Sequence, residues 1–145
     1  MFRYLLCLST VAALFTDCAP GTGAFHIDEL FAQPNDIVQR GQSVTFRLAY
    51  TVPQGLYVPS AHVALTMTVN NYVLPARRSE YAKNQIFPGQ HNYTTTFAIP
   101  LGVSGRILAV ANFYNVSGEQ LMCTRWNATV PSASLYKKKK WFLFG

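Results

Sequence analysis

Hydrophobic and polar residues alternate with a period of two along most of this chain. Apolar side chains recur at every second position in three segments, which span residues 43–50, 63–70 and 93–99. Such alternation is typical of a β-strand with one buried face and one face in water. The segment 106–114 is apolar on both faces, which predicts a central strand with the core on one side and another covering element on the other. Residues 25–31 and 121–130 complete the predicted strands.

Turn-forming residues separate these segments. They are Pro34-Asn35-Asp36, Arg40-Gly41, Pro53-Gln54-Gly55, Asn70-Asn71, Pro88-Gly89, Gly102 with Gly105, and Ser117-Gly118. No helical periodicity of useful length interrupts the pattern. Short strands with regular turns predict an all-β fold, an immunoglobulin-like β-sandwich of about seven antiparallel strands. The length of 145 residues suits one such domain.

The N-terminal sequence predicts a secretory signal peptide. Arg3 precedes an apolar run over residues 4–15 that is too short to span a bilayer. The small-residue rule for cleavage is met at Val11-x-Ala13 and at Thr22-x-Ala24, and less well just before Asp17. We therefore expect a signal peptide over residues 1–16 with cleavage between 13 and 24, a folded domain over 17–130, and a tail over 131–145. A short hydrophobic helix at the N-terminus is the alternative.

The positive charge of the chain is concentrated in the C-terminal tail. The net charge is +6, and four of these charges belong to the lysines at 137–140. Residues 17–136 carry seven Lys or Arg against six Asp or Glu, a balance of about +1. Because no basic and aromatic groove is evident outside the tail, we exclude nucleic-acid binding.

The tail combines basic and aromatic residues in a compact unit. Its predicted membrane-contact residues are Lys137, Lys138, Lys139, Lys140, Trp141 and Phe142. Each lysine near an anionic leaflet contributes about 1 kcal/mol, and aromatic rings sit at the level of the headgroups. The unit therefore predicts a transient contact with an anionic membrane surface, and a tail without a role is the alternative.

Cysteine and histidine usage points to an oxidising compartment and to no metal. Cys7 falls in the signal peptide, so Cys18 and Cys123 are the candidates for a disulfide, provided that cleavage leaves Cys18 in the mature chain. The three histidines (His26, His62 and His91) are scattered and lack the spacing of metal ligands. We expect neither a metal nor a cofactor.

Three glycosylation sequons support passage through the secretory pathway. They begin at Asn92, Asn115 and Asn127. A glycan on Asn92 would turn that residue outward, and Tyr93 and Phe97 would then point inward on the same strand. The expected location is extracellular or the endolysosomal lumen.

Three segments of the domain carry a recognisable order of cysteine, glycine and hydrophobic residues: TDCAPGTGAFHIDEL, QRGQSVTFRLAY and GEQLMCTRWNATV. They resemble the ML lipid-recognition family, which includes the Niemann–Pick type C sterol carrier and the group 2 mite allergens, and the resemblance extends over residues 17–130. It implies a disulfide between Cys18 and Cys123 and two sheets that splay around an apolar cavity for a sterol or phospholipid. The chain departs from the family where AQPND and KNQIFPGQ replace segments that usually carry further cysteines.

If the fold is ML-like, the inward residues of the strands are the candidates for the cavity wall. They are Phe46, Leu48, Val63, Leu65, Met67, Tyr93, Phe97, Ile107, Ala109 and Phe113. An inward residue of a sandwich is more often ordinary core than cavity wall, because pockets occupy a minority of the interior.

Two classes of function compete. The first is a monomeric, non-catalytic lipid-binding or transfer protein. The second is a secreted immunoglobulin-like adhesion module without a lipid, although Trp126 follows Cys123 instead of standing between two strand cysteines. An enzyme is disfavoured because Asp28 and Glu29 are adjacent and point to opposite faces of a strand, and because no Gly-x-Ser-x-Gly or phosphate-binding loop is present.

Overall fold

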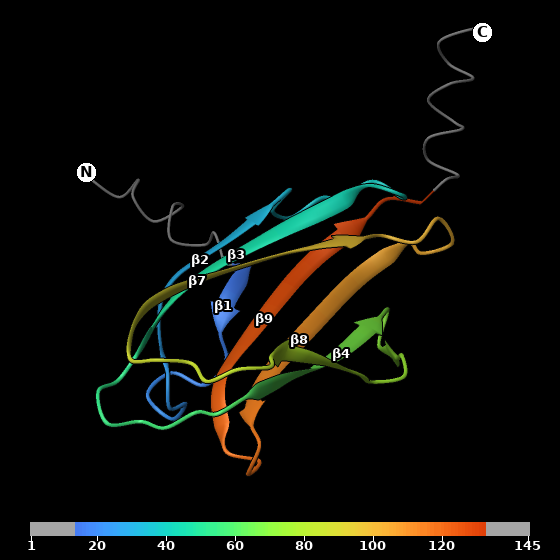
Figure 1. The fold of residues 1–145 in the computed structure, drawn as a ribbon. Helices are drawn as coiled ribbons and strands as arrows, with labels where there is room; N and C mark the ends of the chain where they lie inside the picture. The colour runs from blue at the N-terminus through green and yellow to red at the C-terminus, as the bar shows by residue number, and fades with distance from the viewer. Residues whose placement is uncertain (1–13, 133–145) are drawn as a thin grey trace, which may run out of the picture.

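Two antiparallel sheets face each other in a computed structural model of the chain, which describes residues 14–132 (Figure 1). The nine strands of this range are β1 (Phe15–Asp17), β2 (His26–Gln33), β3 (Ser43–Val52), β4 (Ala61–Val69), β5 (Tyr72–Val73), β6 (Arg77–Ala82), β7 (Gly89–Ala98), β8 (Gly105–Asn115) and β9 (Gln120–Val130). The same range contains no helix that could cross a membrane.

The strand order defines a large sheet and a small one. The large sheet runs β1-β9-β8-β4, and both β5 and β6 pair with the far edge of β4. The small sheet runs β2-β3-β7. The prediction of an all-β sandwich is confirmed, and the strands of six residues or more number seven. The pattern of the sequence did not reveal β6, because its residues are polar and exposed over most of its length.

The apolar segment 106–114 lies at the centre of the large sheet, as β8 between β9 and β4. Its inner face carries Ile107 and Phe113, which are buried. Leu108 and Val110 on the outer face are partly exposed. The expectation of a second covering layer is therefore wrong for residues 14–132, where the sandwich has two layers only.

The turn between β4 and β5 holds the connection between β7 and β8 against the large sheet. Asn70 and Asn71 both adopt positive φ, at 50° and 72°, as a two-residue hairpin turn requires. The Asn70 side chain donates to the carbonyl of Ser104 and accepts from the backbone N–H of Arg106. This amide therefore ties the hairpin to the connection between β7 and β8.

Buried side chains form two clusters between the sheets. One cluster contains Phe25, Leu48, Tyr50, Val52, Val58, Ala61, Val63, Ile86, Phe113, Leu121 and Met122. The other contains Ala32, Val38, Val44, Ile99, Ile107, Trp126, Ala128 and Val130. The core is thus divided along the length of the sandwich, and the division leaves room for a cavity between the two parts.

A disulfide fastens one edge of the large sheet. Cys18 and Cys123 form a disulfide with a Cα–Cα separation of 5.1 Å, which agrees with the predicted pairing. The three residues of β1 pair with β9 beside it. Phe15 and Thr16 of β1 fall within the range that the sequence assigns to the signal peptide, so cleavage after Ala13 would preserve this edge and cleavage after Ala24 would remove it.

Candidate functional site

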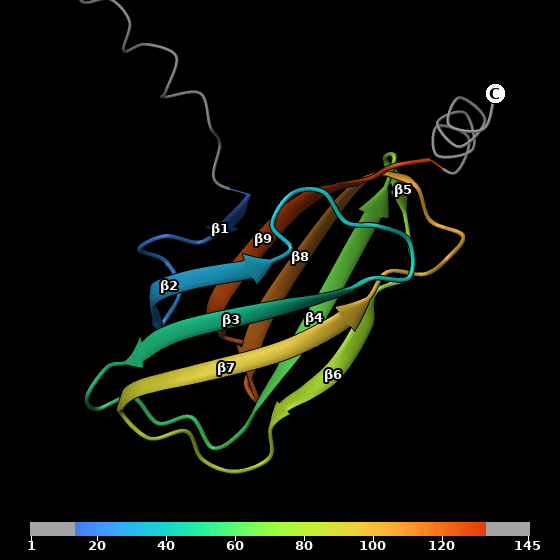
Figure 2. The same ribbon diagram turned by 90° about the horizontal axis from the view of Figure 1, so that it is seen from above.

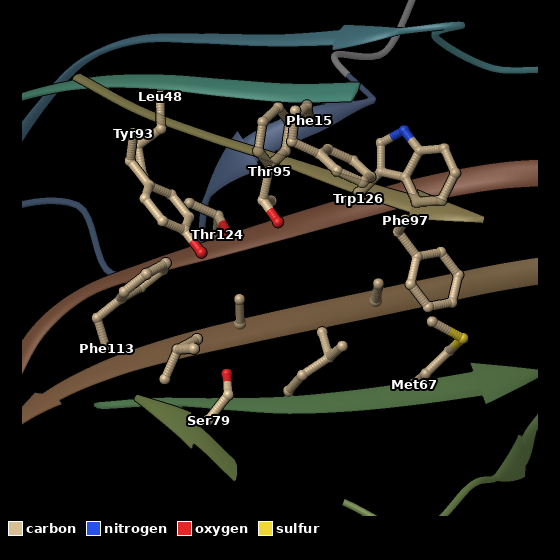
Figure 3. Close-up of a pocket in the computed structure, with 15 residues that line it drawn as sticks. Phe15, Leu48, Met67, Ser79, Tyr93, Thr95, Phe97, Phe113, Thr124 and Trp126 are labelled. Atoms are coloured by element: carbon tan, nitrogen blue, oxygen red, sulfur yellow. The ribbon is translucent and has the colours of Figure 1, made fainter. Parts of the chain in front are cut away.

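An apolar cavity of about 170 Å³ lies between the two sheets (Figure 3). Its walls come from β3 and β7 of the small sheet and from β1, β4, β6, β8 and β9 of the large sheet. The lining residues are Phe15, Phe46, Leu48, Val63, Leu65, Met67, Ser79, Tyr93, Thr95, Phe97, Ala109, Ala111, Phe113, Thr124 and Trp126. Most of these side chains are hydrocarbon or aromatic, and none is an acid or a base.

The structure brings nine of the ten predicted wall residues to this cavity. Ile107 is the exception, because it is buried in the cluster around Trp126 and lines no part of the cavity. The prediction missed Phe15, Ser79, Thr95, Ala111, Thr124 and Trp126. Phe15 was assigned to the signal peptide, whereas the alternation along β9 was sufficient to place Thr124 and Trp126 on its inner face.

The cavity opens between two edge strands. Among its lining residues, Ser79 and Thr95 are the most exposed, and the others are buried or partly buried. Ser79 lies on β6 and Thr95 on β7, and these strands border the two sheets on the side away from the disulfide (Figure 2). We call β6 and β7 the two lips of the mouth. Each lip carries one hydroxyl, and the apolar walls begin immediately inside the mouth.

Aromatic rings close the cavity at one end. Tyr81 of β6 packs edge-on against Tyr93 of β7 with ring centroids 4.8 Å apart, and against Phe113 of β8 at 5.0 Å. The hydroxyl of Tyr81 donates a hydrogen bond to the hydroxyl of Tyr50. Burial raises the pKa of Tyr81 above its ordinary value, and the hydrogen bond to Tyr50 adds to the shift. Burial also raises the pKa of Tyr50. Burial therefore favours the neutral form of both phenols, Tyr81 on the edge strand β6 and Tyr50 on the central strand β3.

A second aromatic group closes the opposite part of the cavity. Phe46 packs edge-on against Trp126 at 5.0 Å and against Phe15 at 5.3 Å. Trp126 is 2% exposed, and its indole N–H donates to the backbone carbonyl of Asn35 at 3.0 Å. Because the one polar atom of the indole is satisfied, the ring presents an apolar surface to the cavity.

The chemistry of these walls suits binding by exclusion of water. Within residues 14–132, no group of three His, Cys, Asp or Glu side chains is placed to hold a metal ion. Apart from the indole N–H of Trp126, which already has a partner, the polar groups of the lining side chains are hydroxyls, which can orient a ligand by hydrogen bonds. Contact with the walls would remove apolar ligand surface from water, at about 25 cal/mol per Å².

The three sequons occupy different environments. Asn92 is exposed on β7, together with Thr94 and Thr96, and Tyr93 points inward as expected. Asn127 on β9 is partly exposed. Asn115 is buried, its Oδ1 accepts from the backbone N–H groups of residues 117 and 119, and its Nδ2 donates to a Glu119 oxygen. The Asn115 amide thus belongs to the β8–β9 turn, and a glycan there would disrupt it.

The predicted membrane-contact residues, Lys137, Lys138, Lys139, Lys140, Trp141 and Phe142, lie outside the described residues. The described part of the chain ends two residues after β9.

Comparison with known proteins supports the fold. No protein-family model matches the sequence, and no curated protein matches it. A Niemann-Pick type C2 protein from Japanese carpenter ant has a similar structure, with a TM-score of 0.59 and 13% identity over 80% of this chain and 98% of that chain.

Two other solved structures share the architecture. The C-terminal domain of wzt matches with a TM-score of 0.57 and 12% identity, over 81% of this chain and 79% of that chain. The Pseudomonas fluorescens DNA glycosylase AlkC matches at 0.53 and 12% identity, over 74% of this chain and 31% of that chain. At such identities the likeness concerns the fold alone.

Proposed function

We propose that this protein binds a lipid between its two sheets and catalyses no reaction on it. The observation that carries the proposal is the apolar cavity of about 170 Å³ with a mouth between β6 and β7. A sandwich with a completely packed interior would offer no such volume. The lining supports binding driven by apolar contact, and the ML-like segments of the sequence support the same function.

The size of the cavity bears on the kind of lipid. Pockets for drug-sized ligands have volumes of about 300–1,000 Å³. The present cavity is smaller, so a single acyl chain requires the least rearrangement. A sterol or a two-chain phospholipid, which the ML resemblance implies, would require the sheets to move apart at the mouth.

The proposed setting is the secretory route, with a mature protein in the extracellular space or the endolysosomal lumen. The disulfide between Cys18 and Cys123 supports an oxidising compartment. We further propose that the tail brings the carrier to anionic membranes. Deletion of residues 137–145 should then slow lipid transfer to anionic vesicles without weakening lipid binding, and an unchanged transfer rate would contradict a role for the tail.

The direct test of the binding function is lipid analysis of the secreted protein. The full-length chain is expressed through a secretory pathway, purified without detergent, and extracted for mass spectrometry. We expect a lipid at close to one molecule per protein. A protein that carries no lipid, and that binds none of a panel of fatty acids, lysophospholipids and sterols, would contradict the proposal and favour the adhesion module.

A further inference from the structure

The lip of the cavity formed by β6 carries a cation on its inner face. In the pairing of β6 with β4, Ser79 stands opposite Val63 and Arg77 stands opposite Leu65. Directly opposed residues of an antiparallel pair point to the same face of the sheet. Because Val63 and Leu65 line the cavity, Arg77 projects from the inner face of the sheet, as Ser79 does.

The facing strand places Arg77 at the open part of the mouth. β6 and β7 run in opposite directions along the two lips (Figure 2). The Tyr81–Tyr93 ring contact joins the lips at one end, and Ser79 and Thr95 line the mouth one step further along. Inward residues recur at every second position of a strand. Two residues beyond Ser79 on β6 and two beyond Thr95 on β7, Arg77 therefore faces Phe97 across the mouth.

No carboxylate of residues 14–132 forms an ion pair with this guanidinium. Arg77 is exposed, and none of its contacts within residues 14–132 is an ion pair. The β7 lip has no acidic residue. The one acid on β6, Glu80, stands opposite His62 on the outer face of the sheet. The mouth thus combines an apolar interior, two hydroxyls and one unpaired positive charge.

We infer that Arg77 binds the anionic headgroup of a single-chain amphiphile whose acyl chain fills the cavity, with the hydroxyls of Ser79 and Thr95 as further donors. This inference rests on the proposed lipid-binding function and specifies its ligand class. The headgroup is a carboxylate or a phosphate, since a guanidinium donates paired hydrogen bonds to either. An exposed charge contact of this kind gives about a fivefold preference over a neutral headgroup.

The neighbouring arginine provides a matched control. Arg78 stands opposite Ala64 on the outer face of the same strand, and its guanidinium lies 3.4 Å from Nδ1 of His62. Arg77→Gln and Arg78→Gln therefore remove the same charge from the same strand, but only the first removes it from the mouth. Thermal unfolding of both variants checks that the fold is retained.

The experiment measures the affinity of the full-length, delipidated protein for three probes with one acyl chain, below their micelle concentrations. The probes are myristate, myristoyl lysophosphatidate and neutral monomyristoylglycerol. The wild-type protein and Arg78→Gln should prefer the anionic probes by about fivefold. Arg77→Gln should lose this preference and bind monomyristoylglycerol as the wild-type protein does. Comparison of myristate with the lysophosphatidate tells which anion is preferred.

The outcomes separate this inference from the binding function. If no probe binds to the wild-type protein, the proposed function itself fails. If all three bind with equal affinity, or if Arg77→Gln keeps the preference, the headgroup inference is overturned and the binding function stands. An equal loss for anionic and neutral probes in Arg77→Gln would also overturn it, because the residue would then act on the shape of the cavity. Inorganic phosphate alone should not compete, since the acyl chain supplies most of the binding energy.

Discussion

The two long edges of this sandwich are built in opposite ways. At one edge the disulfide joins Cys18 to Cys123, and β1 extends the large sheet alongside β9. At the other edge, β6 and β7 face each other with exposed polar residues, and the described contact between them is the ring pair Tyr81–Tyr93. One edge of the large sheet is thus fixed covalently, whereas β6 and β7 leave the opposite side of the sandwich open.

This difference separates stability from binding. The disulfide restrains the unfolded chain and fixes the start of the domain against β9 of the large sheet. Residues at the open edge determine what can enter between the two sheets. Substitutions at the two edges should therefore affect different measurements, and the following variants test that separation.

The largest expected effect is on stability, from removal of the disulfide. The bridge closes a loop with a sequence separation of 105 residues, for which chain entropy predicts about 4–5 kcal/mol. The double variant Cys18→Ala with Cys123→Ala should lose most of this free energy of unfolding in denaturant titrations. Its affinity for an acyl-chain ligand, measured under conditions where it remains folded, should stay near that of the wild-type protein. A double variant that remains folded but no longer binds the ligand would contradict the separation of stability from binding.

The next effect is on binding, from a substitution that fills the cavity. Ala111 lines the cavity at the centre of the large sheet. Ala111→Leu should lower the affinity for acyl-chain ligands by about tenfold or more, because the added carbons take the place of at least two ligand CH₂ groups at about 0.8 kcal/mol each. The matched control is Ala64→Leu, the same change at a position whose neighbour in the register, Asn112, lies outside the cavity. Equal losses of affinity in calorimetric titrations of the two variants would contradict the assignment of the cavity as the binding site.

A smaller effect is expected from loosening the end of the mouth. Tyr81→Phe removes the hydrogen bond to Tyr50 and should lower the free energy of unfolding by about 1 kcal/mol. The same substitution should also change how the free energy of unfolding depends on alkaline pH. The pKa of Tyr81 is raised in the folded protein above its ordinary value of about 10. The contribution of neutral Tyr81 to the free energy of unfolding is therefore complete below that pH, and it declines as the pH rises further because the unfolded chain loses the proton first.

Denaturant titrations between pH 8 and about pH 11 test this alkaline loss. The wild-type protein should lose stability more steeply than Tyr81→Phe above about pH 10. The matched control is Tyr57→Phe, which removes the hydroxyl of an exposed tyrosine and leaves the Tyr81–Tyr50 hydrogen bond intact. Identical profiles for the wild-type protein and Tyr81→Phe would refute the role given to the buried pair.

Glycosylation should have the smallest effect and should mark the outer faces of both edges. Asn92 on β7 and Asn127 on β9 are accessible, whereas the buried amide of Asn115 holds the turn before β9. Intact mass after secretion from eukaryotic cells should show that Asn92→Gln and Asn127→Gln each remove one glycan. Asn115→Gln should leave the glycan mass unchanged and lower the melting temperature. Loss of a glycan in Asn115→Gln would contradict the prediction that the buried Asn115 amide holds the turn and carries no glycan.

Local patterns in the sequence were sufficient for the fold and for most of the cavity wall. Alternation along β3, β4 and β7 assigned Phe46, Leu65 and Phe97 to inner faces, and the structure places all three at the cavity. Ile107 follows the same rule, but it lies in a packed part of the core. A period of two tells which face a residue occupies, and it cannot tell where along the strand the two sheets separate.

The mouth could not be predicted for a different reason. β6 is exposed and mostly polar, so no hydrophobic pattern identifies it as a strand, and its partner β4 is known only from long-range pairing. The inward position of Ser79 and Arg77 follows from that register alone. Phe15 was not predicted because it lies at the end of the apolar run over residues 4–15, and that run was interpreted as a signal peptide.

The central claim is that an acyl chain enters the apolar cavity, and a chain-length series tests it most directly. Saturated fatty acids of increasing length are titrated into the delipidated wild-type protein by calorimetry. Affinity should rise by about fourfold per added CH₂ and then reach a plateau once the cavity is full, with a negative heat-capacity change. Absence of binding, or an affinity independent of chain length, would contradict the account.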